Sequence, residues 1–211
     1  MMSFLDELIT QRRSIRQYGP ETPPEAWIEQ MLNLAAQAPS SGNTQPVRFI
    51  RVSSPEVKAS LHQAMESSRE RFLQASAGCS KPKNLKNWIN AYYRFSAFMF
   101  QAPVLFAVGT VAPSLGLSRR LAEAGVIQPG KRWETDADIA VGLALQNFTL
   151  KGQELGLGSC ILTVPLVFIS RIEEILSVTD VTIKCLIIVG FPAEKPRTPK
   201  KKGGADISRQ I

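Results

Sequence analysis

One long apolar segment constrains the fold more than any other feature of the sequence. From Thr135 onward, apolar residues recur at helical spacing on several sides of the segment, at Ile139, Val141, Leu143, Leu145, Phe148 and Leu150. A helix that is apolar on several sides is normally buried, and glycines such as Gly156 and Gly158 commonly follow a helix end. The sequence therefore predicts a buried central helix that forms the spine of the core.

Short strand-like runs and amphipathic helices occupy the rest of the chain. Apolar spacing, prolines and glycines predict helices over 4–11, 25–38, 55–77, 84–100 and 165–176, and extended segments over 47–52, 104–108, 159–164 and 182–190. Residues 112–132 are rich in proline and glycine, so we expect a surface excursion there. The order is α+β, without a repeat or a linker, and 211 residues suit one core. The sequence predicts a single domain over residues 1–211.

Charge and cysteine content narrow the classes of partner. The formal net charge is +7, which favours a phosphate or another polyanion, but no nucleic-acid-binding motif accompanies it. His62 is the only histidine, so a histidine-based metal site or catalytic triad is not expected. Cys79, Cys160 and Cys185 lack the paired spacing of a metal or redox site, and we expect buried free thiols.

One uncharged stretch requires a membrane test. Residues 95–118 carry no charge and are long enough to span a bilayer. Gln101 and Pro103 interrupt the stretch, which favours a helix ending near Phe100 and a buried strand over 104–108. A charged and then apolar leader is also absent from the start of the sequence. We therefore expect a cytoplasmic protein that does not bind a membrane.

A basic segment near the start offers a candidate phosphate site. In an extended backbone, side chains two residues apart share a side, so Arg12, Ser14 and Arg16 would point together. Two guanidinium forks and a hydroxyl can bind phosphate oxygens with charge-assisted hydrogen bonds. The alternative is a solvated basic turn.

Two further polar segments offer binding groups. The loop 39–46 carries serine, asparagine and glutamine side chains between Pro39 and Pro46, so it either holds a flat heterocycle or is an ordinary turn. Three consecutive lysines follow soon after the last predicted strand, at Lys200, Lys201 and Lys202. They form either a second phosphate contact or a solvated tail. Trp88, Tyr92 and Tyr93 lie at helical spacing, which favours core packing over a substrate pocket.

The combination of these segments resembles the nitroreductase family of flavin enzymes. The matching stretches are 12–16 (RRSIR), 38–46 (APSSGNTQP), 156–160 (GLGSC) and 189–196 (VGFPAEKP). The resemblance covers nearly the whole chain and is weakest between about residues 60 and 135. The chain departs from many members at Val47, where they carry tryptophan, and in the tail, where they carry a clear arginine.

The resemblance implies a fold and a cofactor site. The expected fold is α+β, with a central, mostly antiparallel sheet flanked by helices, in an obligate homodimer with one flavin mononucleotide (FMN) in each of two interface pockets. By this likeness, Arg12, Arg13, Ser14 and Arg16 hold the phosphate, ribityl and pyrimidine end, with help from Lys200 and Lys202. Pro39, Ser40, Ser41 and Asn43 of the partner subunit cover the ring. Ile161, Leu162 and Thr163 bring backbone towards its central nitrogen.

The resemblance also implies an activity. FMN would carry the hydride chemistry, so no side chain is expected to act as a catalytic acid or base. The expected reaction is a ping-pong transfer from NAD(P)H to a small acceptor that is nitroaromatic, quinone-like or related. Flavin destruction or reductive dehalogenation is the alternative within the family, with a lid built from residues 79–95 or 112–132. The alternative of another class is a flavin- or nucleotide-binding regulator without turnover.

Overall fold

The computed structural model describes residues 2–111, 117–128 and 132–210. The four strands are β1 (Val47–Arg51), β2 (Val104–Val111), β3 (Gly158–Leu162) and β4 (Val181–Gly190). The main helices are α1 (Phe4–Gln11), α2 (Glu25–Ala35), α3 (Pro55–Ala75), α4 (Pro82–Ala97), α5 (Leu117–Glu123) and α6 (Arg132–Glu154). Three short helices follow, α7 (Pro165–Phe168), α8 (Ile172–Ile175) and α9 (Gly204–Ile207).

The strands form one antiparallel sheet in the order β1-β2-β4-β3. Thr110 of β2 pairs with Val47 on one side and with Thr182 on the other, while Gly158 of β3 pairs with Gly190. The starts of β1 and β4 therefore lie at the same end of the sheet, on either side of β2, and β3 begins at the other end. The predicted α+β fold with an antiparallel sheet flanked by helices is confirmed.

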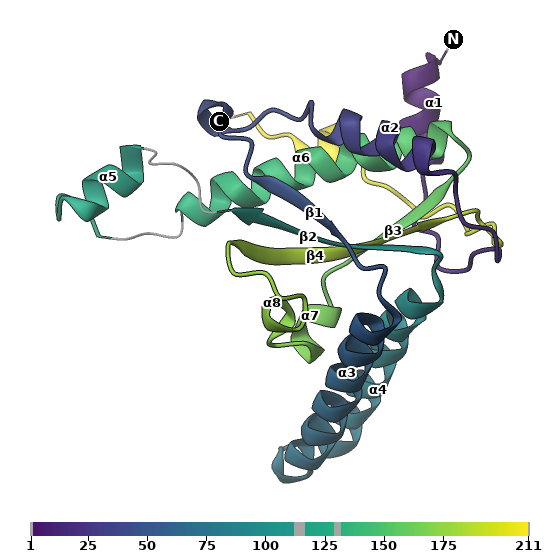
Figure 1. The fold of residues 1–211 in the computed structure, drawn as a ribbon, viewed down its shortest axis with the longest axis vertical. Helices are drawn as coiled ribbons and strands as arrows, with labels where there is room; N and C mark the ends of the chain where they lie inside the picture. The colour runs from purple at the N-terminus through teal and green to yellow at the C-terminus, as the bar shows by residue number, and fades with distance from the viewer. Residues whose placement is uncertain (1, 112–116, 129–131, 211) are drawn as a thin grey trace.

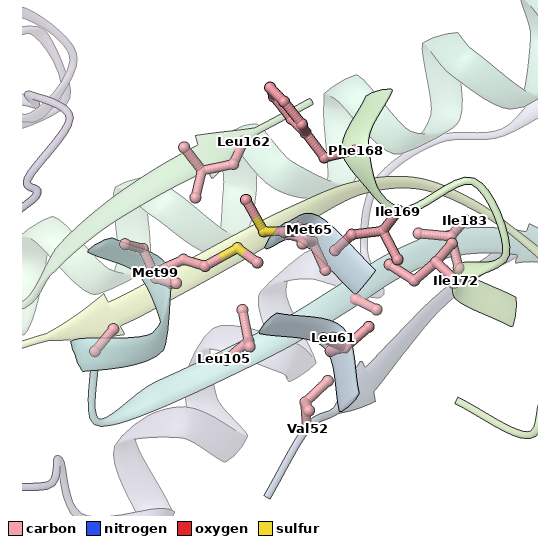
Figure 2. Packing of buried hydrophobic residues seen from close by; sticks show 14 of the residues in the cluster. Val52, Leu61, Met65, Met99, Leu105, Leu162, Phe168, Ile169, Ile172 and Ile183 are labelled. Atoms are coloured by element: carbon pink, nitrogen blue, oxygen red, sulfur yellow. The ribbon is translucent and has the colours of Figure 1, made fainter. Parts of the chain in front are cut away.

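Helices cover both faces of the sheet (Figure 1). Alternate residues of β2 face opposite sides, as the period of a strand requires: Phe106 packs towards α2 and α6, and Leu105 packs towards α3. Figure 2 shows the core on the α3 side of the sheet, where Leu61 and Met65 of α3 lie beside Met99 and Leu105. Since both faces are apolar, the central strand β2 and the second half of β4 carry nearly continuous hydrophobic runs.

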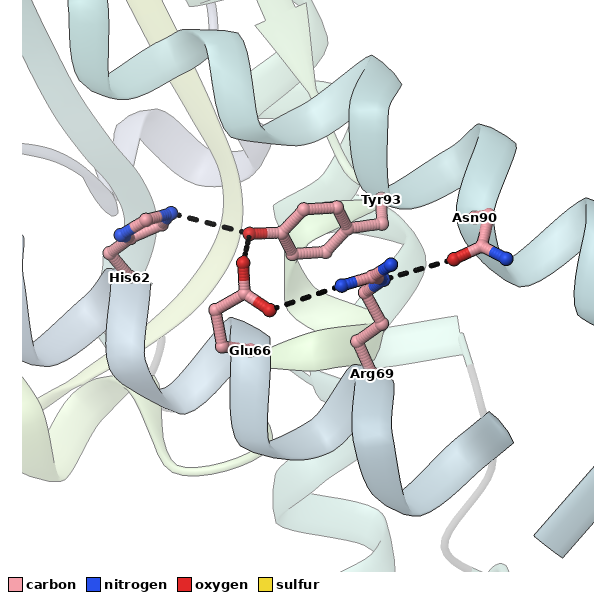
Figure 3. Close-up of polar contacts among 5 residues, drawn as sticks. All are labelled: His62, Glu66, Arg69, Asn90 and Tyr93. Atoms are coloured by element: carbon pink, nitrogen blue, oxygen red, sulfur yellow. Dashed lines mark hydrogen bonds and ion pairs between the residues drawn. The ribbon is translucent and has the colours of Figure 1, made fainter. Parts of the chain in front are cut away.

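The α3–α4 pair extends from the body as a helical hairpin (Figure 1). Ser54 caps α3 by accepting a hydrogen bond from the backbone N–H of Val57, and proline occupies the first turn of both helices. A polar cluster joins the two helices, in which the Tyr93 hydroxyl contacts both His62 and Glu66 (Figure 3). These bonds fix the register of the hairpin.

Two predicted elements differ from the structure. The predicted helix 165–176 is divided into α7 and α8, with non-helical backbone at Ile169 and Arg171. The predicted central helix exists as α6, but it is not buried on all sides, because Ile139 and Leu143 are 55% and 39% exposed. Val141, Leu145 and Phe148 of the same helix pack in the core between α6 and the sheet.

The predicted surface excursion lies partly outside the described residues. Residues 112–116 and 129–131 are not described, and α5 lies between them. Within the part of the chain that the structure describes, every helix is too short or too polar to cross a membrane.

Candidate functional site

The basic segment 12–16 is fixed to the start of β3. Ser14 forms a parallel bridge with Ser159, and the N–H of Ile15 donates a 3.0 Å hydrogen bond to the carbonyl of Ser159. A side chain on Gly158 would clash with Ile15, because its Cβ would lie 2.5 Å from Ile15 Cγ1. Glycine at this position therefore permits the close approach, and the segment is extended as predicted.

The charges of Arg12 and Arg16 and the hydroxyl of Ser14 all act on one group, the thiol of Cys160. Burial raises the pKa of Cys160, and the positive charge of Arg16, the hydroxyl of Ser14 and the charge of Arg12 oppose that rise. Three alternate residues thus act on one buried group, and their shared side stays a prediction from the extended backbone. Within the described residues, the guanidiniums of Arg12 and Arg16 have neither a hydrogen-bond nor an ion-pair partner. They remain available to an anion.

A second segment, residues 191–198, pairs with the basic segment. The backbone bonds from Gly19 N–H to Phe191 carbonyl and from Ala193 N–H to Gln17 carbonyl are both 2.9 Å long. One oxygen of Glu194 accepts hydrogen bonds from the N–H groups of Arg16 and Gln17. Sequence analysis missed the role of Glu194, although it lies inside the quoted stretch 189–196. An acid enclosed between Pro192 and Pro196 was the available signal.

Arg13 connects the two segments in a different way from Arg12 and Arg16. Its guanidinium donates to the carbonyls of Thr10 and Arg12 and, at 3.2 Å, to the hydroxyl of Thr198. The tail therefore reaches the basic segment two residues before Lys200. Lys200 and Lys202 are exposed beyond that contact.

The loop 39–46 adopts a sterically unusual backbone. Three of its residues have positive φ angles, Gly42 at 59°, Asn43 at 53° and Gln45 at 45°. Two of these are not glycine, and such conformations occur where surrounding bonds enforce them. Ser40 Oγ accepts a 2.9 Å bond from the N–H of Gln45, and Arg48 donates to the Gln45 carbonyl. The side chains are thus displayed on a rigid turn.

Two cavities adjoin this loop. One, of about 140 Å³, lies between the loop, the end of α2 and α6, and includes Pro39, Ser40 and Ala140 in its lining. The other, of about 220 Å³, is lined by Ser41, the exposed Ile139 and Leu143 and their neighbours. Pro39 and Ser40 therefore lie beside the exposed apolar side of α6.

The loop and the basic segment lie at diagonally opposite corners of the sheet. The loop directly precedes Val47, which pairs with Thr110 of β2, and Thr110 pairs in turn with Thr182 of β4. The basic segment is attached at Ser159, which pairs with Val189 of β4. Thr182 and Val189 are seven residues apart along β4, which corresponds to about 23 Å. The two edge strands that carry the segments add further separation. One chain therefore does not bring both segments to the same small ligand.

The predicted ring-side residues Ile161, Leu162 and Thr163 lie at the end of β3 and directly after it. The carbonyl of Ser159 accepts the bond from Ile15 and therefore points away from β4. In an antiparallel strand, the N–H and C=O of any one residue point to the same side, and successive residues alternate. The alternation places the N–H of Ile161 on that same edge, next to the basic segment. Ile161 and Thr163 are exposed, and Leu162 is buried in the core.

Some sequence expectations for other side chains were wrong. Cys160 and Cys185 are buried free thiols as predicted, but Cys79 is exposed. Tyr93 is buried as expected for a core aromatic, whereas Trp88 and Tyr92 are 60% and 43% exposed and stack on each other. Of the two suggested lid segments, most of 79–95 forms α4. The other, 112–132, is only partly described.

Comparison with known proteins identifies related sequences. The sequence model of the Nitroreductase family matches residues 9–191. Iodotyrosine deiodinase from Thermotoga neapolitana is 27% identical over 206 residues, which cover 95% of this chain and 96% of the relative.

Solved structures of similar fold include two flavin-related proteins. A BluB-like flavoprotein from Clostridium difficile 630 superposes with a TM-score of 0.83 at 23% identity, over the full length of both chains. NADPH:FMN oxidoreductase from Vibrio harveyi, complexed with NAD+, gives a TM-score of 0.68 at 16% identity, over 97% of this chain and 75% of that one. At these identities the likeness establishes the fold.

Proposed function

Since this chain belongs to the nitroreductase family, we propose that it is an FMN-dependent oxidoreductase that transfers electrons from NAD(P)H to a small organic acceptor. The observation that carries the proposal is the pair of guanidiniums of Arg12 and Arg16, which have no partner among the described residues and alternate with Ser14 along an extended segment. This donor set suits a phosphate group, whose oxygens accept paired, charge-assisted bonds.

The chain's own residues would bind and orient the cofactor. Arg12, Ser14 and Arg16 form the proposed phosphate cradle, and Arg13 holds the tail so that Lys200 and Lys202 extend the positive field. FMN would supply the hydride chemistry. The outer edge of β3 would direct the N–H of Ile161 towards the ring, and the nearby arginines would stabilise negative charge that develops on its pyrimidine edge. Side-chain acid–base groups have no assigned part in this scheme.

We propose that the site is completed by a second copy of the chain. Pro39, Ser40, Ser41 and Asn43 lie too far from the cradle of their own chain to cover a flavin held there. The apolar side chains of α1, among them Phe4 and Ile9, are exposed, as are Ile139 and Leu143 of α6. An isologous dimer would bury these surfaces and bring each loop to the partner's cradle. Residues 1–211 act as one domain in this arrangement.

A spectroscopic experiment tests the proposal. The purified protein, supplied with FMN and freed of excess, should be yellow and dimeric, and NADH or NADPH should bleach it in the absence of oxygen. A nitroaromatic or quinone acceptor should then restore the colour. A yellow protein that is never bleached would favour the non-catalytic regulator, and a protein that takes up no FMN would exclude both assignments.

Reductive dehalogenation is a second candidate, favoured by the near full-length match to a deiodinase. In that case the FMN-loaded protein, given a chemical reductant, would release iodide from 3-iodotyrosine. Iodide release that does not exceed that of free FMN would exclude this candidate and leave the oxidoreductase proposal unaffected.

A further inference from the structure

Glu194, in the segment 191–198, accepts two hydrogen bonds from the basic segment that forms the proposed cradle. Its Oε1 accepts the N–H of Arg16 at 2.5 Å and the N–H of Gln17 at 3.1 Å. Two successive backbone N–H groups that converge on one oxygen form a concave donor pair, which favours an anion. The anion here is a side chain that lies 178 residues from Arg16 in the sequence.

The neighbouring bonds show why this contact matters to Arg16. The N–H of Ile15 is bonded to Ser159, and the hydroxyl of Tyr18 donates a 2.5 Å hydrogen bond to the carbonyl of Ile15. Gly19 and Gln17 bond to the 191–193 segment. Residues on both sides of Arg16 are therefore fixed by other groups, and the backbone of Arg16 itself depends on Glu194.

The Glu194 carboxylate also lies close to the charged side of the cradle. Its negative charge acts on both Tyr18 and Cys160, as the charge of Arg16 does with opposite sign. The structure records no ion pair between Glu194 and the Arg16 guanidinium among the described residues. Glu194 thus holds the backbone of Arg16 while its guanidinium remains available to a ligand.

We propose that Glu194 is a positioning residue of the cradle, which fixes the direction of Arg16 and lowers the positive potential at the flavin. The inference rests on the proposed function. Charge-assisted bonds to backbone N–H groups are about twice as strong as neutral ones, so the carboxylate suits the task. A glutamine in its place would keep an acceptor oxygen but not the charge.

Two variants separate the positioning role from the charge. Glu194→Ala should weaken FMN binding by about tenfold or more, because the Arg16 N–H loses its partner. Glu194→Gln should recover most of that affinity, and it should raise the reduction potential of the bound flavin because a nearby negative charge is lost. Isothermal titration with FMN and a redox titration of the bound flavin give the two readouts.

Glu173 supplies a matched control. Its Oε1 accepts a 2.9 Å bond from the backbone N–H of Ile183 in β4, at the end of that strand remote from the cradle. Glu173→Ala should lower thermal stability without changing the FMN dissociation constant. If Glu194→Ala did the same, or if Glu194→Gln bound FMN as weakly as Glu194→Ala, the positioning role would be refuted.

Amide hydrogen exchange tests the inference independently of flavin. The amides of Arg16 and Gln17 should exchange faster in Glu194→Ala than in the wild type, while the amide of Ile15 remains protected by Ser159. Equal exchange at Arg16 and Gln17 in both proteins would overturn the inference even if FMN did not bind. Wild-type protein that fails to bind FMN would instead overturn the proposed function.

Discussion

Arg12 and Arg16 differ from Arg13 in what their guanidiniums contact. Arg13 is occupied with two carbonyls and with Thr198, whereas Arg12 and Arg16 have no bonded partner within the described chain. The sequence predicted a shared side for Arg12, Ser14 and Arg16 from period-two spacing alone. It could not separate Arg13 from the others, because Thr198, the side-chain partner of Arg13, lies 185 residues away.

Replacement of both free arginines tests the phosphate cradle. Arg12→Ala combined with Arg16→Ala should weaken FMN binding by about 3 to 6 kcal/mol, since each charge-assisted bond contributes about 1.5 to 3 kcal/mol. Calorimetric titration measures the loss. Arg171→Ala is the control, because Arg171 is an exposed arginine paired with Glu174 on α8. Unchanged affinity in the double variant would refute the assignment.

Tyr93 shows how a single hydroxyl joins two helices. Burial, followed by the hydrogen bond to Glu66, raises the pKa of Tyr93 to about 12. In the unfolded chain the phenol ionises near 10, so its contribution to stability is intact below pH 10 and is lost as pH rises towards 12.

Tyr93→Phe should cost about 1 kcal/mol of unfolding free energy at neutral pH, the usual net value of a lost hydrogen bond. The difference from the wild type should narrow between pH 10 and 12, where the wild-type hydroxyl becomes unfavourable. Urea denaturation at several pH values measures both effects. A difference that stayed constant with pH would contradict the role given to the hydroxyl.

Among the elements, α6 shows the limit of hydrophobic periodicity most clearly. Its pattern correctly predicted a long helix in the core, but it could not tell the apolar side chains that pack against the chain's own sheet from those that stay exposed on its surface. Ile139 and Leu143 are four residues apart and share the exposed side. The break between α7 and α8 was also missed, because neither glycine nor proline marks it. Tertiary contacts such as Glu173 with Ile183 hold α8 against β4.

Charges on the exposed side of α6 should disrupt the dimer. Ile139→Glu combined with Leu143→Glu places two carboxylates where an apolar interface is proposed, and burial of unpaired charge is strongly unfavourable. Light scattering should show monomers, and these should not retain FMN. Val167→Glu is the control, because Val167 is 64% exposed on α7, across the sheet from α6. A variant that remained dimeric would exclude α6 from the interface.

At the scale of the whole molecule, the two parts of the candidate site, the loop 39–46 and the basic segment 12–16, lie at opposite corners of the sheet. Sequence order could not reveal this separation, because it follows from the strand register, in which β4 lies between β2 and β3. The resemblance to a family supplied the dimer expectation, and the geometry of a single chain supplies a physical reason for it.

Mixing two inactive chains tests this division. One chain carries Arg12→Ala and Arg16→Ala, and the other carries Ser40→Ala and Asn43→Ala. Random exchange in an equal mixture should yield half heterodimers, each with one intact site, so about a quarter of the wild-type sites should bind FMN. Unmixed variants serve as controls. If each chain housed a complete site of its own, the mixture would recover no binding.

The pairing of residues 12–19 with residues 191–198 has a consequence for biosynthesis. A ribosome makes the arginines of the cradle early, yet Glu194 and Thr198 emerge only after the whole sheet has been translated. A chain that ends before residue 194 would lack both contacts, and under the proposed function it should retain FMN less tightly than the longer chain.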